Sequence, residues 1–332
     1  EVGNLIVHVE GRRQEPRRMF STHMDTVPDC VGCKPWLDRD AGRIVNKAPG
    51  RALGGDNRNG CAILLALARA LIARDGDHAP ATIVFFIQEE VGLVGARGLD
   101  LSLLGDPRPA FCINLDGGPV AELVTAVTGT ERFTIDISGI PSHAGRPANG
   151  ASAAVVMGLA VADLQRGGWH GGIEKGGSIG SANVGVVSGG QGSNVVMPSM
   201  SILAEARSHD AEFRAEIIRH WKQAFRTAAM EIETAAGAHP TVDFGPGPTY
   251  EAFALSDDDP VVRMTVEAAK RVGFELTTVS NDGGMDANQI NAHGIPAVTI
   301  AVGQRQVHTA DEWIDLADFE RACRVVVELG IC

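Results

Sequence analysis

Four short apolar runs in the chain lead into histidine or acidic side chains. The runs span residues 18–22, 81–87, 110–115 and 297–302, and the polar residues that follow them are His23, Glu89, Glu90, Asp116 and His308. Imidazole nitrogens and carboxylate oxygens are ligands that proteins use for divalent cations such as zinc. Together with Asp56, these residues supply two histidines and three carboxylates as ligands and leave one glutamate spare. The inventory predicts a site for two cations bridged by one carboxylate, with a water molecule between them.

The immediate neighbours of the candidate ligands add detail to this interpretation. Asp25 follows His23 by two residues, so in an extended strand both side chains share one face and the carboxylate can orient the imidazole. Asp56 lies in a glycine-rich segment, where unusual backbone angles can aim its carboxylate inward. Glu89 and Glu90 point to opposite sides at the end of a strand, so one can bind a cation while the other serves as a base. Taken singly, a surface His–Asp pair and a helix N-cap loop are alternative explanations for the first two features.

The apolar runs themselves read as buried strands of a mostly parallel sheet, because they are continuous rather than alternating. Helical patterns are interspersed with them, at residues 59–74, 259–272 and 318–329. In open α/β sheets, ligands bind beyond the carboxyl ends of the strands. Since the candidate ligands lie at such ends, this fold class would bring them together. We therefore expect an α/β sandwich as the catalytic domain.

The middle of the chain has a different pattern. It reads as a strand, a helix, two strands, a helix and a strand, at residues 131–137, 151–164, 182–187, 201–207, 211–235 and 241–244. This β-α-β-β-α-β order is that of the ferredoxin-like fold. We expect residues 119–250 to form an inserted ferredoxin-like α+β domain, which would act as a lid and in dimerisation. Residues 1–118 and 251–332 would then form one discontinuous catalytic domain.

The composition argues against several classes of function. The chain of 332 residues has a formal net charge of −12, which is unfavourable for nucleic-acid binding. No run reaches the ~18 apolar residues that would cross a membrane, and no signal peptide is visible. The six cysteines are scattered, which suits a reducing, cytoplasmic compartment better than a disulfide framework. Cys30 and Cys33 form an isolated C-x-x-C pair, which we interpret as incidental because no second pair accompanies it at zinc-finger spacing.

Six short motifs give the chain a family resemblance. They read S-T-H-M-D-T-V, G-G-D-N-R-N-G, Q-E-E-V-G, N-L-D-G-G, S-H-A-G and V-H-T-A-D-E, and they occur in family order across nearly the whole chain. In this combination the chain resembles the dinuclear zinc peptidases, the family of peptidase T, glutamate carboxypeptidase and aminoacylase. Within that family it looks most like the peptidase T-like branch of tripeptide aminopeptidases.

The resemblance implies a role for each candidate ligand. His23 and Asp116 would hold one zinc ion, and Glu90 and His308 would hold the other. Asp56 would bridge the two ions. Because histidine and carboxylate ligands also suit cobalt and manganese, Co²⁺ and Mn²⁺ are alternatives to Zn²⁺.

The resemblance also assigns the two remaining acidic residues. Asp25 would orient His23, and Glu89 would be the general base. Glu89 would take a proton from the water between the two ions as that water attacks the carbonyl, and would pass it to the leaving amine. The chain departs from the family where Asn57 and Arg58 stand in place of the usual Asp and Lys.

Further positions match the family's substrate-binding pattern. His143 is similar to the residue that polarises the scissile carbonyl, often across a dimer interface, although its residue type alone would also suit an ordinary loop. Asn194 and Arg207 are similar to the pair that holds a substrate carboxylate or backbone, a task that suits the guanidinium fork. Gly284 and Asp286 lie in a stretch that matches a loop lining the family's site.

The resemblance favours an aminopeptidase that acts on short peptides, since Asp at the position of Asp116 goes with the aminopeptidase and dipeptidase branches. A carboxypeptidase or an N-acyl amino acid amidohydrolase of the same family is the alternative. A non-catalytic metal- or peptide-binding homologue is an alternative of another class, which an intact Glu89 disfavours. The family pattern also implies a homodimer formed through the inserted domain.

Overall fold

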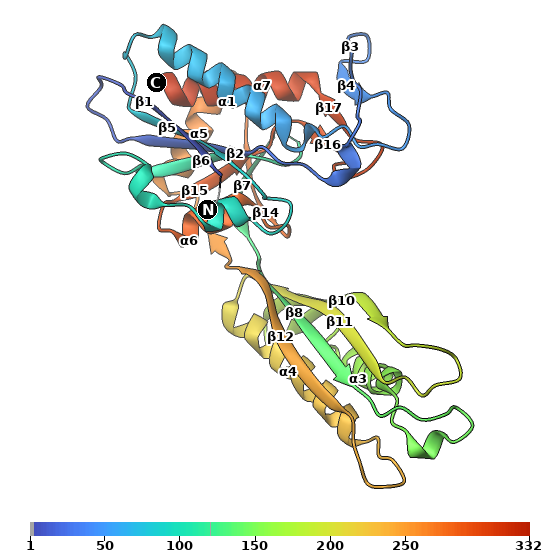
Figure 1. Cartoon of the computed structure of the whole chain (residues 1–332). Helices are drawn as coiled ribbons and strands as arrows, with labels where there is room; N and C mark the ends of the chain where they lie inside the picture. Colours follow the sequence, from blue (N-terminus) through green and yellow to red (C-terminus); the bar gives the residue numbers. More distant parts are fainter. Residues whose placement is uncertain (1–2, 120) are drawn as a thin grey trace. The chain divides into compact units, whose positions relative to one another are not determined.

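The computed structural model describes residues 3–119 and 121–332, and the chain divides into two compact units (Figure 1). The first unit contains the chain up to Val127 together with Phe253–Cys332. The second unit is the continuous segment Thr128–Ala252. Among the described residues, no helix is both long and apolar enough to cross a membrane.

The first unit is built on an eight-stranded sheet. Its strands are β1 (Leu5–Val9), β2 (Arg18–His23), β5 (Ala81–Phe86), β6 (Phe111–Leu115), β7 (Glu122–Val127), β13 (Phe253–Ala254), β14 (Thr277–Asn281) and β15 (Ala297–Ile300). They are ordered β1-β5-β2-β6-β15-β7-β13, and β14 pairs with β7. The central pairs β5–β2, β2–β6 and β6–β15 are parallel. The carboxyl ends of four strands therefore lie along one edge of the sheet.

Helices cover both faces of this sheet (Figure 1). The helices are α1 (Gly55–Ala73), α2 (Val94–Arg97), α5 (Pro260–Arg271), α6 (Asp286–Ala292) and α7 (Leu316–Ile331), with short 3-10 turns at Pro28–Cys30 and Leu101–Leu103. Apolar residues of α1, α5 and α7 form one core with the sheet, and residues of α2 and α6 contribute to the core on its other face. Strands β2 and β5 are buried along their whole length, which explains why they read as continuous apolar runs.

A small second sheet in the first unit contains the strands on either side of the segment that carries His308. It contains β16 (Gln304–Arg305), β17 (Trp313–Asp315), β4 (Arg43–Asn46) and β3 (Pro35–Asp38), in that order. The strands β16 and β17 pair antiparallel and enclose the segment that contains His308. The ends of that segment are therefore fixed by backbone pairing.

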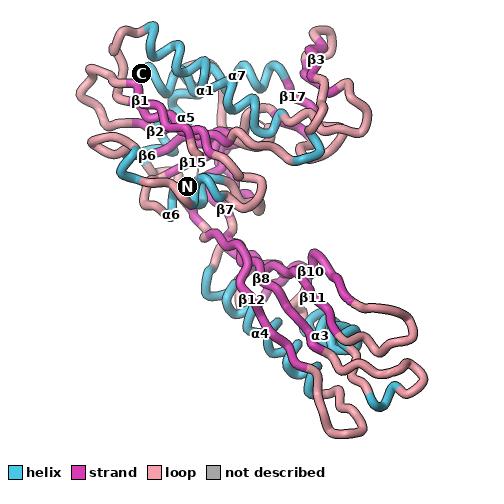
Figure 2. Tube along the Cα trace, in the orientation of Figure 1, coloured by secondary structure: helices cyan, strands magenta, loops and turns pink. Residues whose placement is uncertain are grey.

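The second unit is a five-stranded antiparallel sheet with two helices packed against it (Figure 2). The strands, in spatial order, are β12 (Thr241–Tyr250), β8 (Gly129–Ser138), β11 (Ser199–Ser208), β10 (Ser178–Gly189) and β9 (Gly171–Lys175). The helices are α3 (Ala153–Gly167) and α4 (Ala211–Met230), and a 3-10 turn spans Pro147–Asn149. Trp221 of α4 is fully buried and its ring meets Phe133 edge-to-face.

The expected α/β sandwich with a ferredoxin-like insertion is the observed fold class, with three corrections to the expected elements. The segment that forms β7 was expected in the inserted domain, but it pairs with β14 and β15 of the larger sheet, so the boundary falls at Thr128. The strand β9 was not predicted and adds a fifth strand to the second sheet. The long helix of this unit ends at Met230 rather than at residue 235.

We expect the core of the second unit to depend on Phe225, which is fully buried on α4 and stacks near Trp221. Replacing Phe225 by alanine should lower the free energy of unfolding of this unit by about 3–5 kcal/mol, because a buried aromatic leaves a cavity. Denaturant-induced unfolding, followed by tryptophan fluorescence, measures this change. Met230→Ala is the matched control, since Met230 lies on the same helix but is 63% exposed. Equal effects of the two substitutions would contradict the proposed packing.

Candidate metal centre

The acidic and histidine residues predicted from strand ends lie together in the first unit. His23 is the last residue of β2, Asp116 directly follows β6, and Glu90 follows β5. Asp56 lies at the start of α1, where its backbone angles are not helical. His308 lies in the loop between β16 and β17. Elements that are distant in sequence thus deliver side chains to one place.

Asp56 lies between the two histidines. Its Oδ1 atom is 3.1 Å from Nε2 of His23, and its Oδ2 atom is 3.2 Å from Nε2 of His308. A second carboxylate approaches the same Nε2 atom of each imidazole. Asp116 Oδ1 is 3.7 Å from Nε2 of His23, and Glu90 Oε2 is 3.0 Å from Nε2 of His308.

These side chains form two overlapping groups that could each hold a cation. One consists of His23, Asp56 and Asp116, the other of Asp56, Glu90 and His308, and the ligand atoms of each group lie within 4.8 Å of one another. A third group with the same spacing consists of His23, Glu89 and Glu90, so Glu89 lies beside the ligands of both groups. Oδ1 of Asp56 is also buried and makes no well-formed hydrogen bond within the described residues. Such an orphaned oxygen, shared between two sets of oxygen and nitrogen donors, fits a pair of divalent cations.

Asp25 has a wider structural role than its spacing indicated. Its backbone carbonyl is 3.1 Å from Nδ1 of His23, whereas the carboxylate lies farther from that nitrogen, at 3.5 Å. The two carboxylate oxygens accept hydrogen bonds from the backbone N–H groups of Glu89 and Glu90, at 3.0 and 3.1 Å. Asp25 therefore holds the turn that presents both glutamates, in addition to contacting the histidine.

The electrostatics of the cluster are those of crowded, partly desolvated charges. Burial on its own would lower the pKa of His23, but the nearby carboxylates of Asp116, Asp25 and Asp56 outweigh it and hold that pKa well above its usual value. For Glu89, burial and then the charge of Asp116 raise the pKa well above that of an ordinary glutamate. This excess of negative charge is what divalent cations would compensate.

Asp286 adds a further buried carboxylate near these charges. It is 1% exposed at the start of α6, and neither oxygen has a hydrogen-bond partner among the described residues. Its pKa is raised to about 8, mainly by burial and also by the negative charges of Asp116 and Asp25, against the lowering effect of His23. Gly284, predicted to line the site, lies two residues earlier in the same loop.

Two of the ligand-bearing loops contain residues in left-handed backbone conformations. Gly54, just before Asp56, has a φ angle of 70°, which glycine adopts without strain. His308 has a φ angle of 64°, a conformation that costs a non-glycine residue about 1 kcal/mol or more. Such strain persists only where surrounding contacts hold it, so the loop of His308 is fixed by its neighbours.

The remaining predicted site residues belong to the second unit. The segments of His143 and Asn194 pair side by side, because Ala144 donates to the carbonyl oxygen of Asn194 at 2.9 Å and His143 forms a β-bridge with Val195. The His143 and Asn194 side chains are both exposed. On β11, Arg207 donates to both carboxylate oxygens of Glu205, at 2.9 and 3.3 Å. The unit thus presents a histidine and an amide from adjacent loops, and a paired guanidinium on the sheet.

The sequence interpretation missed two buried polar residues that hold the loop of Asp56. Glu312 accepts hydrogen bonds from the backbone N–H groups of Gly54 and Asp56, and the Nε2 atom of Gln304 lies within hydrogen-bond distance of the same loop. Glu312 is the last residue of the motif that contains His308, so the motif carried a signal for it. Nothing comparable marked Gln304.

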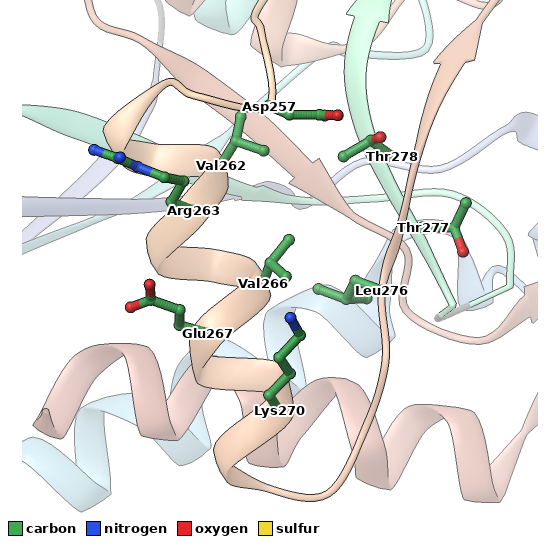
Figure 3. A pocket seen from close by; sticks show the side chains of 9 residues that line it. All are labelled: Asp257, Val262, Arg263, Val266, Glu267, Lys270, Leu276, Thr277 and Thr278. Carbon is green, nitrogen blue, oxygen red and sulfur yellow. The ribbon is translucent and has the colours of Figure 1, made fainter.

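The shape of the surface does not identify the metal centre. A cavity of about 460 Å³ opens between α5 and β14, lined by Val262, Val266 and Leu276 and by charged residues such as Arg263 and Lys270 (Figure 3). None of the residues that line it belongs to the ligand cluster. The chemistry of the side chains, and not this cavity, points to the site.

Comparison with known proteins agrees with this geometry. The model of peptidase family M20/M25/M40 matches residues 19–330 of the chain. The Bacillus subtilis (strain 168) protein YqjE is 30% identical over 328 residues, which cover 98% of this chain and 84% of that protein.

Two solved structures are similar over nearly the whole chain. A tripeptidase from Staphylococcus aureus superposes with a TM-score of 0.87 at 28% identity, covering 99% of this chain and 83% of that chain. The aminopeptidase PepT from Bacillus cereus superposes with a TM-score of 0.83 at 32% identity, covering 99% and 84% of the two chains.

We expect Asp56→Asn to weaken the binding of two cations, because Asp56 belongs to both ligand groups. Glu90→Gln should weaken mainly the cation held by Asp56 and His308, since the Glu90 carboxylate is 3.0 Å from Nε2 of His308 and Glu90 shares no group with Asp116. Calorimetric titration of chelator-treated protein with Zn²⁺ counts the sites. Asp75→Asn is the control, because the Asp75 side chain is 98% exposed and remote from the cluster in sequence. Two undiminished sites in Asp56→Asn would contradict the shared-ligand geometry.

Proposed function

The chain belongs to peptidase family M20/M25/M40 and is a hydrolase, and from this premise we propose that it is a two-metal aminopeptidase that acts on short peptides. The observation that carries the proposal is the carboxylate of Asp56 between His23 and His308, with a further glutamate, Glu89, close to His23 and Glu90. A site of this kind can bind two cations and still keep a separate base. A protein that only bound metal would have no use for Glu89.

Similarity supports the choice of substrate class within the family. Both solved structures described above, a tripeptidase and the aminopeptidase PepT, share the fold over 99% of this chain. The Asp at position 116 is also the residue that the family resemblance associates with aminopeptidase and dipeptidase branches. We therefore propose tripeptides and other short peptides with a free amino terminus as substrates.

The residues present fit two divalent ions, which we propose to be zinc, with cobalt or manganese as alternatives. His23 and Asp116 would hold one ion, Glu90 and His308 the other, and Asp56 both. Bound there, the ions would polarise the scissile carbonyl and lower the pKa of a water molecule.

The proton transfer falls to Glu89 in this proposal. Its carboxylate accepts the proton of the attacking water and delivers it to the nitrogen of the leaving amine. Asp25 fixes the backbone of Glu89 through a 3.0 Å hydrogen bond and so sets where that carboxylate stands. A rigidly held base of this kind is what general acid–base catalysis requires.

The second unit supplies the proposed substrate contacts. His143 would polarise the scissile carbonyl, and Asn194 and Arg207 would hold the peptide backbone or its carboxylate. Adjacent pairing of the His143 and Asn194 segments supports a shared task for those two residues. The roles of this unit as a lid and as the interface of a homodimer stay predictions from the family resemblance.

Turnover of a free tripeptide and of an N-acetylated amino acid, with zinc-loaded and chelator-treated protein, tests the proposal. We expect metal-dependent release of the amino-terminal residue from the tripeptide and no cleavage of the acylated compound. Cleavage of the acylated compound alone would move the protein to the amidohydrolase branch. Release of the carboxy-terminal residue would make it a carboxypeptidase, and no turnover of either compound by loaded protein would favour a binding function.

Glu89→Ala should retain both metal ions and lose at least about 10²-fold in kcat, because the base contributes to proton transfer and not to the ligand set. Metal content by atomic emission and tripeptide turnover are measured on the same sample. The control is Glu90→Ala, which should lose metal as well as activity. If the two variants behave the other way round, the roles of Glu89 and Glu90 are exchanged.

His143→Ala should lower kcat while the zinc content stays unchanged, because His143 belongs to the second unit and to neither ligand group. A loss of about 10²-fold is expected for a group that stabilises charge on the carbonyl oxygen. His170→Ala, on the same unit, provides the comparison. Unchanged turnover in His143→Ala would remove His143 from the mechanism.

A further inference from the structure

We propose that Glu312 and Gln304 are positioning residues, which fasten the loop of Asp56 to the segment that carries His308. They would preorganise the second cation site, that of Asp56, Glu90 and His308, whereas the first is that of His23, Asp56 and Asp116. The inference rests on the proposed two-metal function, since it concerns how two of its ligands are held. Neither residue belongs to the ligand groups themselves.

Glu312 accepts hydrogen bonds from the backbone on both sides of Gly55. Its Oε2 atom accepts a hydrogen bond from the N–H of Gly54 at 2.6 Å, and its Oε1 atom accepts one from the N–H of Asp56 at 3.0 Å. The residue is 2% exposed, so water does not compete for these bonds. A carboxylate buried to this extent is costly unless its oxygens are satisfied, and here the two backbone groups satisfy one oxygen each.

The glycines of this loop permit these two hydrogen bonds to Glu312. A β-carbon on Gly55 would lie 2.9 Å from Cγ1 of Ile314 and 3.1 Å from Oε1 of Glu312. Any side chain at position 55 would therefore push the loop away from Glu312. Gly54 supplies the left-handed turn, at a φ of 70°, that aims both N–H groups at the carboxylate.

Gln304 holds the other side of the same loop. Its Nε2 atom lies 3.2 Å from the carbonyl oxygen of Gly55, and 3.1 and 2.8 Å from the side-chain oxygens of Asn57 and Asn59. Gln304 is 1% exposed, and Asn57 is fully buried. Asn57 in turn donates to Asp116 Oδ1 at 3.2 Å, so the contact reaches a ligand of the other cation.

Gln304 and Glu312 are the two ends of the segment that has His308 within it. Inside the segment, the hydroxyl of Thr309 donates to the carbonyl oxygen of Gln306 at 2.7 Å, and the N–H of Glu312 donates to the carbonyl oxygen of Thr309 at 3.2 Å. Because both Gln304 and Glu312 bind the loop of Asp56, they fix the distance between Asp56 and His308. His23 and Asp116, by contrast, are fixed by β2 and β6.

The substitution Glu312→Gln tests the inference with little change in shape. A glutamine has one acceptor oxygen, so its amide group would face one of the two backbone N–H groups and break that bond. Asp311→Asn is the matched control, because Asp311 is the adjacent residue, is exposed and loses the same charge. Circular dichroism and thermal unfolding establish that each variant is folded.

Two measurements decide the outcome. In calorimetric titration with Zn²⁺, we expect Glu312→Gln to weaken the second cation about tenfold or more and the first cation less, while Asp311→Asn matches the wild type. In chelator-treated protein, hydrogen exchange at the amides of Gly54 and Asp56 should accelerate at least about tenfold in Glu312→Gln only. Both cations bound with wild-type affinity, together with unchanged exchange, would overturn the inference.

The exchange measurement separates this inference from the proposed function. If the wild-type protein bound no pair of cations, the two-metal function would fail, but protection of the two amides by Glu312 would still be decided by exchange. Gln304→Leu is the second variant, to be used if Glu312→Gln does not fold. It removes the amide of Gln304 while filling its space, and it should weaken the second cation without altering the exchange of Gly54. Wild-type affinity for both cations in Gln304→Leu would overturn the role of Gln304.

Discussion

The carboxylate of Asp56 must face two imidazoles at once, at 3.1 and 3.2 Å, and the larger unit is arranged around that requirement. One imidazole, His23, ends a strand in the middle of the sheet and has almost no freedom to move. The other, His308, comes from the loop between β16 and β17 and depends on contacts with neighbouring segments for its position. A shared carboxylate fits between them only if both loops are held to within a few tenths of an ångström.

Two buried or half-buried carboxylates do much of this holding without themselves belonging to the overlapping ligand groups. Asp25 binds the backbone of Glu89 and Glu90, and Glu312 binds the backbone on either side of Gly55. In both cases an acidic side chain accepts from two backbone N–H groups, which is a directional and rigid arrangement. The acidic character of this region therefore has two sources, since some carboxylates would bind cations and others bind the loops that present them.

The sequence was most informative where a local pattern and a general rule of sheet architecture coincide. Buried parallel strands read as apolar runs, and their carboxyl ends share one edge, so the clustering of His23, Glu90 and Asp116 could be predicted from their places in the chain. The segment of β7 could not be placed in this way, because its pairing with β14 and β15 is decided by contacts far along the chain. Glu312 is 258 positions from Gly54, and no spacing rule connects a turn residue to a backbone so distant. The roles of the second unit stay predictions, because they rest on resemblance alone.

The pairing of β7 with β13 explains how the sheet of the first unit tolerates the insertion of the second unit. The second unit departs after Val127 and the chain returns at Phe253, and these two residues are register partners in the sheet of the first unit. Where a short hairpin turn would suffice, a whole folded unit is inserted, and the entropy of closing such a connection rises only slowly with its length. The first unit can thus accommodate an insertion at this point as it would a longer surface loop. The pairing of β7 with β13 keeps the sheet of the first unit continuous at this point, whatever chain lies between the two strands.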